Sequence, residues 1–150
     1  MKLDSGHWLA SRYNFYLLGH GLIVVAVICF FRIIPDTKIA ALCAGTLFLL
    51  GPSWVILSEF KNKAGWRSLS FFAAALFLCL SALPILILRL ANWGTPFSEL
   101  SLLGFSGPEL HQYSNHIYLI MLAAFAADSV WSRIKAWKTK TKSDQTLVAK

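Results

Sequence analysis

Four apolar segments restrict the fold of this chain more than any other feature. They comprise residues 15–34, 39–58, 69–88 and 113–131. Each is close to the ~20 residues that a helix needs to cross a hydrocarbon core of ~30 Å. The segments lack the alternation of apolar and polar residues that barrel strands show, so helices are the remaining way to satisfy backbone polar groups in lipid. We therefore predict an all-α fold, a bundle of four transmembrane helices.

Composition and spacing predict that residues 1–150 form a single integral membrane domain. Hydrophobic residues make up 57% of the chain and charged residues only 14%, which is too apolar for an ordinary soluble domain. Connections of about 4, 10 and 24 residues leave no room for a second domain. The first segment lacks a small-residue cleavage pattern, so we expect it to be retained rather than removed as a signal peptide.

The distribution of basic residues predicts the orientation in the membrane. Of the 14 Lys and Arg residues, only Arg32, Lys38 and Arg89 fall on the side opposite the termini. Cytoplasmic segments carry the excess of Lys and Arg. Both termini are therefore expected in the cytoplasm, where the net charge of +7 is concentrated.

The basic cytoplasmic tail, residues 132–150, is expected to bind the membrane surface. Each Lys or Arg near an anionic lipid surface contributes about 1 kcal/mol of attraction. No folded element for reading bases is visible, so we expect no nucleic-acid partner. The lysines assigned to anionic lipids are Lys135, Lys138, Lys140 and Lys142.

Several residues inside the segments indicate packing against neighbouring helices. Gly51-Pro52 and Pro84 remove backbone donors, so each proline should bend its helix and leave a carbonyl for a neighbour to satisfy. Asp128 is costly in lipid and should reach the interface or meet Arg133 or a lysine. These features favour a packed bundle over separate helices.

Soluble-enzyme motifs are absent from the sequence. It contains no phosphate-binding glycine loop, no HExxH pair and no acid–base pair within the four segments. Cys29, Cys43 and Cys79 occur singly inside the segments, which suits small buried hydrophobic residues better than a thiol–disulfide centre. The sequence thus favours a protein that is not an enzyme, and we assign no catalytic residue and no metal site.

The histidines are the remaining candidates for cofactor chemistry, because imidazole is an axial ligand of haem iron and bundle cores hold such cofactors. His20 and His116 are separated by roughly 15–20 Å along the membrane normal, at ~1.5 Å per residue. His111 and His116 lie about 140° apart around one helix. No two of these histidines can share one metal, so each needs another partner or is a hydrogen-bonding residue at a helix end.

Three blocks of the sequence resemble the bacterial cytochrome b-561 family. RYNFYLLGHGLIV (12–24) is similar to its first helix, in which an Arg-Tyr pair precedes a haem-ligating His. ALPILILRLANWGTPFSELSLLGF (82–105) resembles the end of its third helix and its long outer loop. LHQYSNHIYLIMLAAFAADSVW (110–131) resembles its fourth helix, which opens with a ligating His.

The resemblance implies a four-helix protein of the bacterial inner membrane with two b haems, one near each face, that exchanges electrons with quinone or an oxygen species. It assigns His20 and His111 as haem ligands. The positions expected for their partners are Ala41, one of residues 73–75, and Ala124, and all are alanine. Because half of each iron site is missing, the cofactor is expected to be either absent or haem b with unusual ligation.

Two functions follow as hypotheses. The first is a non-catalytic accessory subunit with a cytochrome b-561-like scaffold, which docks on other integral membrane subunits of a respiratory or photosynthetic complex. The alternative is a b-type haem electron-transfer protein that uses His20, His111 or both. A third possibility is a protein that binds a lipid or another small molecule in the space left by the alanines.

Overall fold

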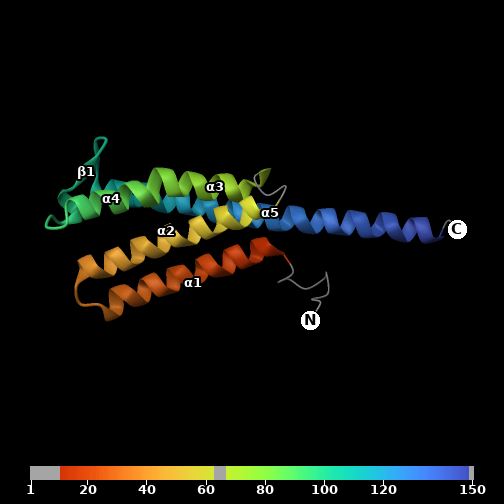
Figure 1. Ribbon diagram of the computed structural model, residues 1–150, viewed down its shortest axis with the longest axis horizontal. Helices are drawn as coiled ribbons and strands as arrows, with labels where there is room; N and C mark the ends of the chain where they lie inside the picture. The colour runs from red at the N-terminus through yellow and green to blue at the C-terminus, as the bar shows by residue number, and fades with distance from the viewer. Residues whose placement is uncertain (1–10, 63–66, 149–150) are drawn as a thin grey trace.

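The computed structural model describes the backbone of residues 11–62 and 67–148, and the side chains of these residues except 140 and 142–148. Lys140 and Lys142 therefore lie outside the described side chains. Within the described ranges, the chain is almost wholly helical (Figure 1). The helical elements are α1 (Arg12–Ile33), α2 (Thr37–Lys61), α3 (Leu69–Phe77), a π-helical turn (Leu78–Ala82), α4 (Leu83–Ala91) and α5 (Gly107–Val148).

Four helices are long and apolar enough to cross a membrane. The third of these spans, Leu69–Ala91, is formed by α3, the π-helical turn and α4 together. The predicted class is thus confirmed in its main features: the chain is mostly helical and has the four long apolar helices of a multi-pass membrane protein. Polar residues cap the starts of two of these spans. Asp36 accepts hydrogen bonds from the Lys38 and Ile39 amides at the start of α2, and Ser68 accepts one from Phe71 at the start of α3.

The four spans pack as a ring in which α1 contacts α2 and α5, and α3 contacts the same two helices. Tyr118 lies in the centre, with its ring 5.2 Å from that of Phe48 and 5.3 Å from that of Phe77. The outward faces carry large apolar side chains such as Leu57 and Leu119, which are about 60% exposed in the isolated chain. An apolar exterior around a packed interior is the arrangement expected in lipid. The buried core consists mainly of Tyr16, Val55, Ala74, Phe77, Ile117, Tyr118, Met121 and Phe125.

Both predicted proline sites are places where helix geometry or hydrogen bonding departs from a regular α-helix. Pro52 lies inside α2, where the Ser53 hydroxyl donates to the Leu49 carbonyl. Pro84 stands in the first turn of α4, directly after the π-helical turn. A π-helical turn is one of the recognised causes of a local bend. In this turn the Ser81 hydroxyl is hydrogen-bonded to Ser114 of α5, so a neighbouring helix supports the irregular segment.

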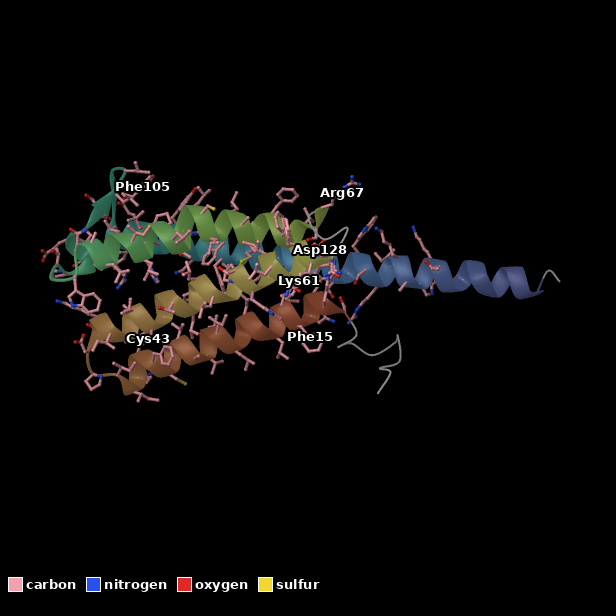
Figure 2. All side chains as sticks on the ribbon, in the orientation of Figure 1. Phe15, Cys43, Lys61, Arg67, Phe105 and Asp128 are labelled. Atoms are coloured by element: carbon pink, nitrogen blue, oxygen red, sulfur yellow. The ribbon has the colours of Figure 1, made fainter. Side chains whose placement is uncertain are left out.

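The loop between α4 and α5 contains a 3-10 turn, Phe97–Glu99, and a short antiparallel hairpin of β1 (Ser101–Leu102) and β2 (Phe105–Ser106). Leu103 and Gly104 form its two-residue turn with positive φ angles of 54° and 87°, as the twist of tight hairpins requires. This hairpin is a small exception to the all-α prediction. It projects sideways at one end of the bundle and carries Phe105 at its edge (Figures 1 and 2).

Close approach of α1 and α2 depends on Gly51. A Cβ atom at this position would lie 2.6 Å from Cδ1 of Ile23 and 3.2 Å from Nε2 of His20. By contrast, a Cβ atom at Gly21 would meet nothing within 4 Å. The two glycines therefore form a matched pair for testing the contact.

Gly51→Val should destabilise the bundle by about 1–3 kcal/mol, because the added atoms overpack the contact between α1 and α2. Gly21→Val should have little effect or stabilise the helix slightly, since valine has the higher helix propensity. Thermal unfolding in detergent, followed by circular dichroism, measures both. Equal effects of the two substitutions would contradict the close approach at Gly51.

Candidate functional site

His20 is buried in the bundle, with 1% of its surface exposed. Its Nδ1 atom lies 2.8 Å from the backbone carbonyl of Tyr16, one turn earlier in α1. Because a carbonyl oxygen can only accept, Nδ1 carries the proton and Nε2 of the neutral ring carries a lone pair. Within the described part of the chain, Nε2 is buried and has no hydrogen-bond partner. An imidazole oriented in this way is chemically suited to ligate a metal.

The surroundings of His20 are closely packed. Its ring lies 5.1 Å from that of Phe125 and 6.0 Å from that of Tyr118, and the Tyr118 hydroxyl donates to the His20 carbonyl over 3.2 Å. Nε2 is directed at Gly51 of α2. An iron atom would stand ~2 Å from Nε2, where the α2 backbone already packs. The donor atom fits haem but the space does not, and we derive no chemistry through a haem at this site.

His111 occupies a different environment at the opposite end of the bundle. It is exposed, and it lines a cavity of about 140 Å³ together with Ala41, Gly45 and Tyr118. The structure thus places His111 and Ala41, one of the alanines at an expected ligand position, around the same cavity. His20 does not line this cavity. His116 is exposed, with Nδ1 2.8 Å from the Gln112 carbonyl.

The other alanine positions do not create a comparable space. Ala74 is fully buried in the core, and Ala73, Ala75 and Ala124 are partly buried. Among the described residues, no group of three or more His, Cys, Asp or Glu side chains could hold a metal ion. The helices have closed around one candidate ligand, His20, and left a cavity beside the other, His111.

A buried carboxylate organises the end of the bundle near the start of α1. Glu59 is 0% exposed, and the side chains of Arg12, Tyr16 and Ser68 contact its carboxylate. We call these four residues and Ser58, which bonds Tyr16, the Glu59 cluster. Arg12 places Nε 2.8 Å from Oε1 and donates from a terminal nitrogen to Oε2 over 3.1 Å. Tyr16 donates to Oε1 over 2.8 Å and also bonds Ser58, and Ser68 donates to Oε2 over 3.0 Å.

The Glu59 cluster offsets the cost of burying a charge. A carboxylate removed from water is strongly destabilising unless it is paired and hydrogen-bonded. Here both oxygens of Glu59 are satisfied by donors from α1 and from the residue that caps α3. The cluster therefore joins the ends of three helices.

Asp128 provides a second polar connection, which differs from the prediction. We expected this residue to reach the interface or pair with Arg133 or a lysine. Instead it is buried, and its Oδ2 accepts hydrogen bonds of 2.8 Å from both the amide and the hydroxyl of Ser70 (Figure 2). The reason is that α3 begins beside it, and helix N-termini offer unpaired amides and favour negative charge.

The same end contains a further link between α1 and α5. Ser129 donates to Asn14 over 2.6 Å, and the hydroxyls of Ser11 and Ser132 lie 3.2 Å apart. Together with the Glu59 cluster and Asp128, these bonds connect all four spans at one end. These hydrogen bonds were not predicted from the sequence, because Arg12 and Glu59 lie just outside the apolar segments. The helices nevertheless extend to include both residues.

The three single cysteines are free, as their spacing suggests, but they are not uniformly buried. Cys29 and Cys79 are exposed on the outer faces of their helices, and Cys43 is partly buried. In a bundle surrounded by lipid, these thiols remain out of water without being part of the core. The predicted burial within the protein is thus wrong for Cys29 and Cys79.

Comparison with known proteins leaves the family open: no protein-family model, no curated protein and no solved structure matches the chain significantly. The resemblance to the cytochrome b-561 family therefore stays a prediction.

Arg12→Gln should lower the free energy of unfolding by about 2–3 kcal/mol, because Glu59 then remains buried without its cation. The double variant Arg12→Gln, Glu59→Gln should recover part of that loss, since neither charge remains. Arg133→Gln, at an exposed position on α5, is the matched control. Chemical unfolding in detergent of the wild type, Arg12→Gln, Glu59→Gln and the double variant gives the coupling energy of the pair. A value near zero would contradict the role of the pair.

Proposed function

We propose that this protein is a non-catalytic accessory subunit that docks on other integral membrane subunits of a respiratory or photosynthetic complex. The observation that carries the proposal is the length of α5. It runs unbroken from Gly107 to Val148 and projects beyond the ends of the other helices (Figure 1). We call residues 132–148 the α5 extension; at ~1.5 Å per residue, it is about 25 Å long.

The α5 extension and the turn before it offer an apolar stripe flanked by cations. Val130, Ile134 and Trp137 recur at the spacing of one helix face and are 57%, 40% and 70% exposed. Helices of this kind bind in grooves of partner proteins through residues at such spacings. Lys135 packs over the ring of Trp131 at 5.6 Å, and Arg133 and Lys138 are exposed beside it. This combination suits a partner groove that is apolar and rimmed by acidic residues.

The proposal includes the location and orientation of the bundle. The start of α1 and the α5 extension lie at the same end (Figure 1), and this end carries most of the Lys and Arg residues. By the positive-inside rule, it faces the cytoplasm of a bacterium, with the bundle in the inner membrane. Lys135 and Lys138, with Lys140 and Lys142, would then lie near anionic lipid headgroups.

Native electrophoresis after mild detergent extraction tests the accessory-subunit proposal. The protein should migrate with a larger complex rather than as a chain of 16.7 kDa. The double variant Ile134→Ser, Trp137→Ser should release it, because the apolar stripe is lost. Thr139→Ser, which preserves the bond from this side chain to the Lys135 carbonyl, should leave the complex intact.

Higher ionic strength should also weaken the complex, because it screens exposed charges over a Debye length that falls from ~10 Å at 0.1 M to ~3 Å at 1 M. A wild-type protein that is monodisperse and migrates alone under mild extraction would overturn the proposal. So would a double variant that remains in the complex.

One observation favours the alternative, a b-type haem electron-transfer protein. Among the described residues, the Nε2 atom of His20 is a potential ligand atom without a hydrogen-bond partner, and ligation would require α2 to move away from it at Gly51. A reduced-minus-oxidised spectrum of the purified protein, made with adequate haem supply, tests this alternative. A b-type α band that disappears in His20→Ala would support it, and a spectrum without that band would exclude it.

A further inference from the structure

A cleft opens at the end of the bundle opposite the Glu59 cluster. Its outer part has a volume of about 440 Å³ and lies between the start of α2, the end of α4 and the loop that follows. Its inner part is the cavity of about 140 Å³ beside His111. Phe31, Ala41, Leu86 and Arg89 line both parts, so the two lie side by side. The outer volume falls within the ~300–1,000 Å³ typical of ligand sites.

Arg89 is the most unusual residue in this cleft. It is half-buried, and its guanidinium stacks on the ring of Phe97 at 3.9 Å. Within the described ranges, it forms no ion pair and no hydrogen bond. Stacking fixes the plane of the guanidinium but leaves its N–H groups free, and these groups bind phosphate in a bidentate way.

The charge of the cleft is one-sided. Lys38 also lines the outer part, and its Nζ atom makes a hydrogen bond of 3.3 Å to the Gly94 carbonyl. Among the residues that the structure describes, no carboxylate lines either part. Asp36 is nearby in the chain, but its side chain caps α2. The mouth therefore presents two cations to a ligand and would repel a cationic headgroup.

The depth and lining of the cleft indicate an amphiphile. Arg89 lies two residues before the end of the Leu69–Ala91 span, which is the level at which lipid phosphates meet the protein. In the inner part, α2 contributes only small residues, Ala41, Ala44 and Gly45, and the rings of Phe48, Phe77 and Tyr118 complete an apolar lining. A Cβ atom at Gly45 would lie 3.1 Å from Leu86, so even an alanine there would narrow the space.

We propose that this cleft binds one anionic glycerophospholipid. Its phosphodiester pairs with Arg89 and Lys38, and the first part of an acyl chain lies in the inner part against Ala41, Ala44 and Gly45. Free phosphate shares the headgroup chemistry but would leave the apolar inner part unfilled. The site is independent of the accessory-subunit function, which uses the opposite end of the molecule.

Photo-crosslinking in vesicles tests this proposal. The full chain is reconstituted in phosphatidylcholine with a small fraction of phosphatidylglycerol that carries a diazirine on its acyl chain. Crosslinks are mapped by mass spectrometry, which separates the cleft from the basic α5 extension. We expect them on residues 41–48 and 85–89, reduced by excess phosphatidylglycerol but not by excess phosphatidylcholine or inorganic phosphate.

Variants add a second test. Arg89→Gln should reduce crosslinking in the cleft about tenfold, the effect of losing one strong charge-assisted pair. Arg89→Lys should retain only part of it, because an ammonium keeps the charge but loses the stacked, bidentate geometry of the guanidinium. Arg32→Gln is the matched control, because Arg32 is an exposed cation at the same end that does not line the cleft. Thermal unfolding identifies any variant that fails to fold, and the competition experiments on the wild type need no variant.

Several results would overturn the proposal. Equal competition by phosphatidylcholine would show that charge does not select the ligand. Displacement by inorganic phosphate would assign the site to free phosphate. Crosslinks spread evenly over the outer faces, or a folded Arg89→Gln protein with unchanged crosslinking, would show that the cleft is not a specific site.

Discussion

The arrangement of the bundle depends on the burial of the Glu59 carboxylate. A charge at this depth is tolerated only where donors surround it, and the donors come from α1 and from the cap of α3. Arg12 and Tyr16 can reach Glu59 only in one register of α1 against α2. The apolar contacts between these helices are far less selective, since lipid competes equally well for them. The hydrogen bonds of the Glu59 cluster thus fix the register of α1 against α2, and the apolar contacts along the bundle form in that register.

How much the sequence predicted depends on the kind of signal. Hydropathy predicted the helical class and the four spans, because the lipid leaves the backbone few alternatives. The partners of Glu59 and Asp128 were not predicted, since they depend on which helix ends meet. One signal was present: Arg12 and Glu59 lie at nearly equal distances from the turn at residues 34–36, so an antiparallel pair of helices brings them together.

The candidate site was predicted in the same uneven way. His20, His111 and the alanines at the expected partner positions could all be picked out from the sequence. The sequence could not show whether the space beside each histidine is filled or open, because that depends on how closely two helix backbones approach each other. Gly51 allows α2 to cover His20, whereas Ala41 and Gly45 line a cavity beside His111. The unpaired guanidinium of Arg89 could not be recognised either, since only the fold shows that no carboxylate among the described residues lines its cleft.

The sequence positions of the buried polar pairs have a consequence for synthesis at the ribosome. Glu59 emerges after its cation, Arg12, and Asp128 emerges after Ser70, the residue that satisfies it. Each acidic side chain is therefore translated when a partner already exists earlier in the chain. As a result, α1 and α2 can enter the bilayer as a hairpin in which Glu59 is already paired. When α5 follows, Ser70 is already in place to bond Asp128. The order of residues along the chain matches an order in which the bundle can be assembled.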